Sequence, residues 1–265
     1  MIKIKEIKAK TMTPEKKSTA KNDIFAYYIG RPISYLFTVP FLYTSIKPNT
    51  ISIISMIFVV LSFLFAILNK ISYVFVFISW IFIFLWNIFD GVDGNIARYK
   101  QIYSKNGSTI DAASGYLAMF FTFLSMGIVA SDLHFWFFDD MLINSDIFFC
   151  ILGAISGFCQ IFPRLIHHKL ANSTKDYNNV LADRSNYNFV KIVGLNLTSI
   201  AGFVQLILLI VVILGFFNIY LFDFFTIFYF LLNMLFCIIS VFKVLKNWWE
   251  VFYELCGNYS WWCRL

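Results

Sequence analysis

Two aspartates and an arginine stand close together in a stretch of the chain that is otherwise apolar or small. The stretch reads Asp90-Gly91-Val92-Asp93-Gly94-Asn95-Ile96-Ala97-Arg98, and a third aspartate follows at Asp111. On a helix, residues at i and i+3 share a face, so the carboxylates of Asp90 and Asp93 repel each other unless a cation neutralises them. Carboxylates at membrane depth are costly and therefore mark a functional site.

The chemistry that these residues favour is phosphoryl transfer on a hard divalent ion. Oxygen ligands without a nearby His or Cys favour Mg²⁺ or Mn²⁺ over Zn²⁺. An EF-hand is excluded, because its third and fifth positions would be Val92 and Gly94, which carry no side-chain oxygen. Facing carboxylates with Arg98 as a fixed cation for phosphate predict two-metal chemistry, in which the ions stabilise the entering and leaving oxygens.

Small residues surround these charges and leave room for a ligand. They are Gly91, Gly94, Ala97, Gly107, Ala112, Ala113, Ser114 and Gly115. Such residues let helix backbones approach each other, so close helix packing alone would also account for them. Together with the acids and Arg98, they indicate a nucleotide site.

The elements that must position these residues are membrane helices. The chain has 265 residues, of which 60% are apolar, 20% aromatic and only 14% charged, against roughly 25% charged in soluble domains. Its hydropathy predicts an all-α, polytopic membrane protein, a bundle of six transmembrane helices in one domain over residues 48–245. The predicted spans are Thr50 to Leu68, Ser72 to Phe89, Ser108 to Ala130, Ile147 to Leu165, Leu195 to Phe217 and Ile219 to Phe242.

The distribution of cations predicts the orientation. Nine Lys and Arg residues precede the first span, and others cluster after spans two and four, whereas the connections after spans one, three and five carry only Lys70. By the positive-inside rule, both termini and the Asp-rich segment face the cytoplasm. The formal net charge of +6 is spread over these loops, so we expect membrane lipids and no nucleic acid as anionic partners.

The two ends of the chain are predicted to lie outside the bilayer core. Residues 1–20 are Lys-rich and lack periodicity, which indicates a disordered basic tail without a removable signal peptide. Residues 21–47 are apolar on one helical face but too short to span, so we expect an N-terminal interfacial amphipathic helix, with a loop as the alternative. Residues 246–265, with Trp248, Trp249, Trp261 and Trp262, predict a cytoplasmic aromatic anchor.

The Asp-rich segment resembles the signature of the CDP-alcohol phosphatidyltransferases. That signature reads D-x-x-D-G-x-x-A-R, eight residues, then G-x-x-x-D-x-x-x-D. Seven of its eight positions match in register, namely Asp90, Asp93, Gly94, Ala97, Arg98, Gly107 and Asp111. Pro48-Asn49-Thr50-Ile51-Ser52, at the start of span one, is similar to a Pro-Asn motif of the same family.

The resemblance implies a magnesium- or manganese-dependent phosphotransferase of phospholipid biosynthesis and lipid metabolism. A phosphatidyl or phospho-alcohol group would move from a CDP-linked donor to an acceptor hydroxyl, with release of CMP. Asp90, Asp93 and Asp111 would hold the metal, normally two ions. Asn49, Gly94, Ala97, Arg98 and Gly107 would hold the cytidine diphosphate.

The eighth signature position departs from the family. It is Gly115. At this position the resemblance implies an aspartate that completes the metal site and acts as general base. Because Gly115 has no carboxylate, the second metal ion is in question. We therefore assign no catalytic residue. Losing a general base typically lowers the rate ~10²- to 10⁴-fold, so an attenuated enzyme and a non-catalytic nucleotide- or metal-binding protein both remain open.

The acceptor, lipid or polyol, is less defined by the sequence. Arg164, Lys169 and Arg184 are candidate acceptor-binding residues, although positive-inside loops need such cations regardless of substrate. Transfer from a soluble CDP-alcohol to a polyol or glycan is the alternative reaction. The richness in Ile, Phe, Asn and Lys favours a bacterial plasma membrane, and a homodimer is compatible with the sequence.

Overall fold

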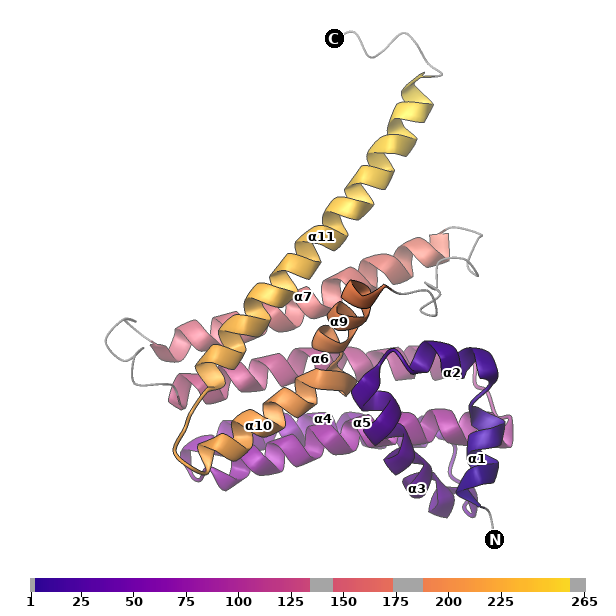
Figure 1. Ribbon diagram of the computed structural model, residues 1–265, viewed down its shortest axis with the longest axis horizontal. Coiled ribbons are helices and arrows are strands. Elements are labelled where there is room, and N and C mark those ends of the chain that lie inside the picture. Colours follow the sequence, from indigo (N-terminus) through magenta and orange to yellow (C-terminus); the bar gives the residue numbers. More distant parts are fainter. Residues whose placement is uncertain (1–2, 134–144, 174–187, 258–265) are drawn as a thin grey trace.

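A computed structural model shows that the chain is all-helical and describes residues 3–133, 145–173 and 188–257. Before the first long helix come four short helical elements: α1 (Ile4–Thr11), α2 (Pro14–Ala20), the π-helical turn η1 (Ala26–Gly30) and α3 (Arg31–Leu42). The remaining elements, shown in Figure 1, are α4 (Pro48–Ile67), η2 (Leu68–Lys70), α5 (Val74–Lys100), α6 (Gly107–Asp132), α7 (Ser145–Ser173), α9 (Phe189–Thr198), η5 (Ile200–Val204), α10 (Gln205–Gly215) and α11 (Phe222–Gly257).

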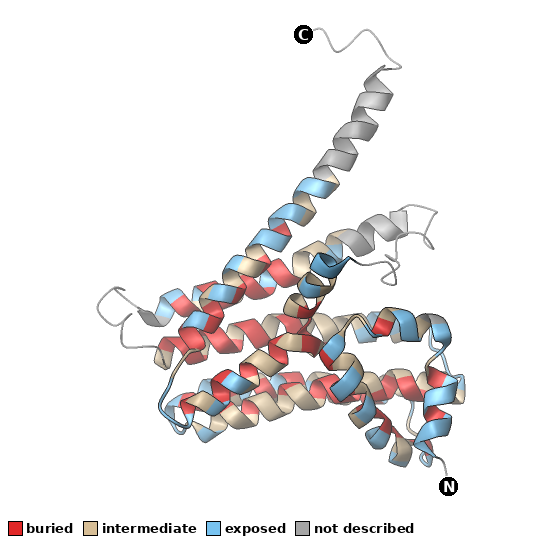
Figure 2. Ribbon diagram, viewed as in Figure 1, coloured by how far each residue is buried: buried red, intermediate tan, exposed pale blue. Residues whose placement is uncertain are grey.

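Within the described residues, five helices are long and apolar enough to cross a bilayer, and a bent pair of helices brings the number to six if the pair is counted as one span. This confirms the predicted polytopic helix bundle. Helix pairs in contact include α4 with α5, α4 with α6, α6 with α7, and α7 with α11. Large apolar side chains remain exposed around the outside, such as Leu231 at 60% and Phe242 at 67% exposure, while buried positions face the interior (Figure 2). Lipid is the solvent that this pattern requires.

Two glycines allow close contact between α6 and α7. A Cβ added to Gly127 on α6 would lie 2.4 Å from the carbonyl oxygen of Phe149 on α7, and one added to Gly153 would lie 2.5 Å from that of Phe123. The two backbones therefore touch where neither residue has a side chain. Small residues drive packing in this way because apolar burial gives no advantage between helices already surrounded by lipid tails.

Buried polar contacts join α4 and α5 to α6. The Ser55 and Ser114 hydroxyls lie 2.9 Å apart, linking α4 to α6. Trp86 Nε1, on α5, donates to Ser114 Oγ at 2.9 Å. These bonds fix the relative rotation of the helices that carry the Asp-rich segment, since a buried donor left unpaired would be costly.

The helix predicted from Leu195 to Phe217 is broken between α9 and η5, which corrects the prediction of a continuous span. The bend between α9 and the following helix is 56°. Ser199 has extended backbone dihedrals, with φ −74° and ψ 114°. Side chains from elsewhere bind this break: Gln160 Nε2 donates to the Thr198 carbonyl at 2.6 Å, and Ser199 Oγ donates to Asp23 Oδ2 at 2.9 Å. Irregular backbone at membrane depth requires such partners.

The N-terminal segment also differs from its prediction. Residues 1–20 are predicted to be disordered, yet α1 and α2 form, and Ile7 is completely buried in a cluster with residues such as Tyr35 and Ile96. The apolar partners of Ile7 lie on α3 and α5. The periodicity of residues 1–20 therefore could not predict that Ile7 is buried. Residues 21–47 contain η1 and α3, in agreement with a helix before the first span; its position in the membrane interface stays a prediction. The side chains of the proposed aromatic anchor at Trp248, Trp249, Trp261 and Trp262 lie outside the described residues.

Candidate active site

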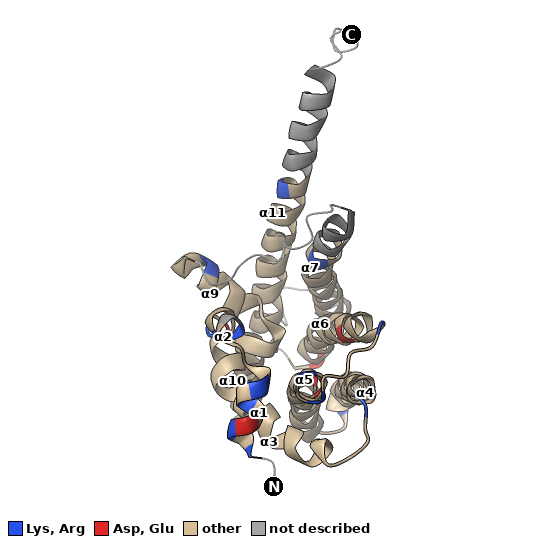
Figure 3. Ribbon diagram, turned by 90° about the vertical axis from the view of Figure 1, so that its right-hand side faces the viewer, with Lys and Arg blue, Asp and Glu red and all other residues tan. Residues whose placement is uncertain are grey.

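A cavity of about 560 Å³ opens at the end of the bundle where α5 ends and α6 begins. Its lining comes from α2, η1, α3, α4, α5, the connection between α5 and α6, and the first turns of α6, together with Ala201 beside the break in the fifth span. Figure 3 looks at the bundle from this end and shows acidic positions on α5 and α6, with basic positions on α1 and α2 nearby.

All three signature aspartates line this cavity. Asp90 and Asp93 lie one helical turn apart on α5, which continues beyond the predicted end of its span to Lys100, and Asp111 lies on α6. Asp93 is buried and accepts a short hydrogen bond from Ser52 Oγ of α4. Within the described residues, none of the three carboxylates takes part in an ion pair. Solvent or a bound cation must therefore reduce the repulsion between these carboxylates.

This donor set suits a hard divalent cation by its chemistry, because it offers carboxylate oxygens and no nitrogen or sulfur. The arrangement is not closed, however: no three Asp, Glu, His or Cys side chains of the described residues stand close enough to hold one ion together. The helices nevertheless bring the three carboxylates to one cavity.

Gly115 lies one turn beyond Asp111 on α6, and it is not among the residues that line the cavity. A Cβ built on Gly115 would meet only the terminal methyl carbon of Met119, at 3.9 Å, which is ordinary van der Waals contact. A Cβ therefore fits at this position without meeting the backbone of a neighbouring helix.

The residues predicted to hold cytidine diphosphate also line the cavity: Asn49, Gly94, Ala97, Arg98 and Gly107. Asn49 Oδ1 accepts a hydrogen bond from Ser104 Oγ at 3.0 Å, which ties the connection after α5 to the start of α4. The guanidinium of Arg98 folds back over Gly94, so that a Cβ at Gly94 would lie 2.7 Å from Arg98 Nη2. Arg98 Nε is buried and has no hydrogen-bond partner within the described residues.

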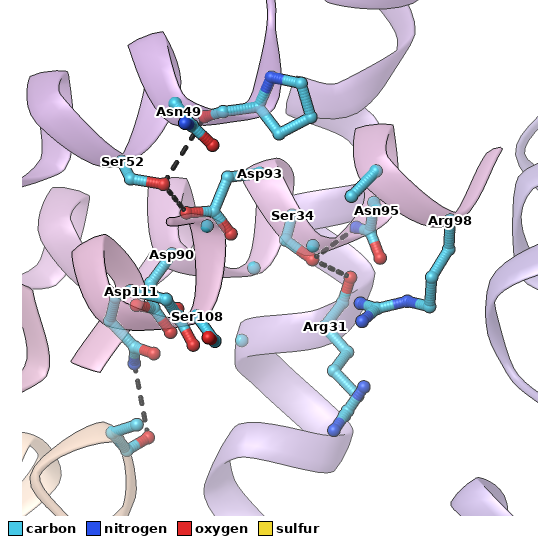
Figure 4. A pocket seen from close by; sticks show the side chains of 18 of the residues that line it. Arg31, Ser34, Asn49, Ser52, Asp90, Asp93, Asn95, Arg98, Ser108 and Asp111 are labelled. Atoms are coloured by element: carbon cyan, nitrogen blue, oxygen red, sulfur yellow. Dashed lines mark hydrogen bonds between the residues drawn. The ribbon is translucent and has the colours of Figure 1, made fainter. Parts of the chain in front are cut away.

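Several cavity residues escaped the sequence analysis. Lys16 on α2, Arg31 at the start of α3, and Asp23 all contribute to the lining. Asn95 of α5 donates to Ser34 Oγ at 3.2 Å and thereby joins α5 to α3 (Figure 4). The sequence could have indicated Arg31 as a site residue, since it is the one cation between Lys21 and Lys47 and precedes an apolar segment. Lys16 is one of six lysines in the first 17 residues, and nothing local distinguishes it.

Of the three predicted acceptor residues, only Arg164 has a side chain among the described residues. Arg164 is exposed on α7 and does not line the cavity. The side chain of Lys169, and Arg184 altogether, lie outside the described residues.

The long apolar helices define a polytopic membrane protein, and within the described residues three carboxylates without ion pairs line one cavity with Arg98 at an end of the bundle. The family model for CDP-alcohol phosphatidyltransferase matches residues 45–242, so the chain belongs to the CDP-alcohol phosphatidyltransferase family. A search of curated protein sequences gave no match. Family membership implies an enzyme that transfers a phospho-alcohol group from a CDP-linked donor and releases CMP, and this family typically uses a divalent metal.

Proposed function

We propose that this chain transfers a phosphatidyl or phospho-alcohol group from a CDP-linked donor to an acceptor hydroxyl at the cavity between α3, α4, α5 and α6. The observation that carries the proposal is that Asp90, Asp93, Asp111 and Arg98 line one cavity together with Asn49, Gly94 and Gly107. The cavity lies beside Lys- and Arg-rich segments, and by the positive-inside rule this supports a cytoplasmic site.

In the proposed reaction, the acceptor oxygen forms a bond to the phosphorus that carries the alcohol. The bond between that phosphorus and the bridging oxygen breaks, and CMP leaves with the bridging oxygen. Arg98 is suited to bind the diphosphate, because its guanidinium reaches into the cavity and the described residues give it no ion pair. Asp90, Asp93 and Asp111 would hold Mg²⁺ or Mn²⁺, which supplies charge neutralisation at the diphosphate when bound.

No carboxylate is assigned as the base that accepts the proton of the acceptor hydroxyl. Gly115 offers no oxygen, and its Cβ direction is open apart from Met119. This observation favours a second candidate, in which the protein binds a CDP-linked ligand and metal with little or no turnover. The first candidate predicts slow, metal-dependent release of CMP, whereas the second predicts binding alone.

The deciding experiment measures CMP release by the purified chain in detergent with Mg²⁺ or Mn²⁺. CDP-diacylglycerol and a set of soluble CDP-alcohols serve as donors, each with lipid, polyol and glycan acceptors. Turnover by the unmodified chain that disappears in Asp111→Asn supports the transferase. Binding of CDP without turnover, combined with turnover by Gly115→Asp, supports the binding protein.

A further inference from the structure

The α1–α2 segment is fixed onto the cavity end of the bundle by packing. Ile7 is fully buried against residues of α3 and α5. Tyr99 Oη, on α5, donates a hydrogen bond of 2.6 Å to Glu6 Oε1, and Lys10 Nζ lies 4.2 Å from the centroid of the Tyr99 ring. These contacts anchor α1 beside the last turns of α5 and so place α2 over the cavity.

From this position α2 contributes Lys16 to the cavity lining. Thr13 Oγ1 accepts a hydrogen bond from the Lys16 backbone N–H at 3.3 Å and caps α2. Arg31, from α3, lines the same cavity as Arg98, and Figure 4 shows both arginines across from the three aspartates. Within the described residues, Lys16, Arg31 and Arg98 make no ion pair.

Lys16, Arg31 and Arg98 lie around one cavity and form no ion pair within the described residues, so their positive charges repel one another. Burial, with Arg98 and Arg31 nearby, lowers the pKa of Lys16 to about 7, while Asp111 opposes this shift. An anion bound among these side chains would replace the repulsion by attraction, and its hydrogen bonds would be charge-assisted. The part of the cavity lined by Lys16, Arg31 and Arg98 therefore favours a negatively charged ligand group.

We propose that Lys16 and Arg31 form an anion subsite, which the N-terminal segment adds to the cavity and which binds a phosphate group of a substrate. Both residues precede the part of the chain that matches the family, residues 45–242, so they supplement the motif residues. The inference rests on the proposed function for the identity of the substrate. The phosphate could belong to the diphosphate of the donor or to a phosphorylated acceptor, and the two sources are separable by experiment.

The experiment measures binding by calorimetry on the full-length protein in detergent, so it does not depend on turnover. The variants are Lys16→Gln and Arg31→Gln, with Lys16→Arg as the charge-preserving variant and Lys17→Gln as a matched control on the exposed side of α2. The first probe is CDP with Mg²⁺, and the second is inorganic phosphate added to protein saturated with CDP. Thermal unfolding shows that each variant is folded.

If the subsite takes the donor, Lys16→Gln and Arg31→Gln weaken CDP binding about 10- to 100-fold, the range for a lost hydrogen bond to a charged group. If it takes a phosphorylated acceptor, CDP binding is unchanged, and the unmodified CDP-loaded chain binds phosphate while Lys16→Gln does not. In either case Lys16→Arg retains binding, and Lys17→Gln matches the unmodified chain. Equal binding of both probes by the unmodified chain, Lys16→Gln and Arg31→Gln would overturn the subsite. Absence of CMP release alongside Lys16-dependent binding would instead overturn the transfer reaction and leave the subsite standing.

Discussion

Ser52 Oγ donates a hydrogen bond to the carboxylate of buried Asp93, and so joins the first turns of α4 to the Asp-rich segment of α5. The same hydroxyl lies 3.3 Å from the Pro48 carbonyl, within its own helix. The bond orients one oxygen of Asp93 toward α4. We expect the hydroxyl to act as a positioning group for this carboxylate.

The acidic residues should be required for turnover. We expect Asp111→Asn to lower metal-dependent CMP release at least ~10²-fold, because a metal ligand and a negative charge in the cavity are lost together. Asp132→Asn is the matched control, since Asp132 pairs with Lys70 at the other end of the same helix, at 2.9 Å. CMP release at saturating Mn²⁺ is the measurement. Equal rates for the two variants would contradict a role for Asp111 in the metal site.

Gly115→Asp should fold and raise activity. The Cβ direction of Gly115 meets only the Met119 terminal methyl, at 3.9 Å, so the substitution adds a carboxylate without a backbone clash. If the missing base limits the rate, we expect an increase of ~10²- to 10⁴-fold in CMP release. Gly115→Asn has nearly the same shape and cannot act as a carboxylate base, so its rate should stay at that of the unmodified chain. A gain in both variants would indicate a packing effect.

Gly94→Ala should act through Arg98. The added methyl group would lie 2.7 Å from Arg98 Nη2, and the flexible guanidinium is the part able to move away. We expect CDP binding to weaken about 10- to 100-fold, which corresponds to a lost charge-assisted hydrogen bond. Calorimetry on Gly94→Ala, Arg98→Gln and the double variant checks the coupling. Additive losses in the double variant would show that Gly94 acts independently of Arg98.

Ligand binding should depend on pH through Lys16. With its pKa near 7 in the free protein, between Arg31, Arg98 and Asp111, the amine is increasingly neutral above pH 7. A bound anion favours the ammonium form and raises this pKa, so binding takes up a proton. If the donor occupies the subsite, affinity for CDP should fall between pH 7 and 9, by at most about tenfold per pH unit. Lys16→Arg stays charged throughout this range and should remove the dependence.

Gly127→Ala should destabilise the bundle. Its Cβ would lie 2.4 Å from the Phe149 carbonyl oxygen, and a backbone atom cannot move aside as a side chain can. We expect a loss of about 1–3 kcal/mol, the range for overpacked sites. Thermal unfolding in detergent measures this loss, with Gly115→Ala on the same helix as the control. Similar unfolding temperatures for the two variants would mean that α6 and α7 separate more easily than their contact indicates.

The sequence by itself determined the membrane class, the approximate spans and the motif residues. Apolar runs of about 20 residues must be helices in lipid, because every backbone hydrogen bond has to be made within the span. The spacing from Asp90 to Arg98 then fixes which side chains share a face of α5. These properties are local, and local sequence specifies them.

Only the tertiary structure decided which other segments reach the cavity. Ile7 finds its apolar partners on α3 and α5, and this contact carries Lys16 to the site from a segment without helical periodicity. At the break between α9 and η5, Ser199 donates a hydrogen bond to Asp23, which is 176 residues away along the chain. Contacts of this kind join groups distant in sequence, and their free energy exists only after the helices have packed.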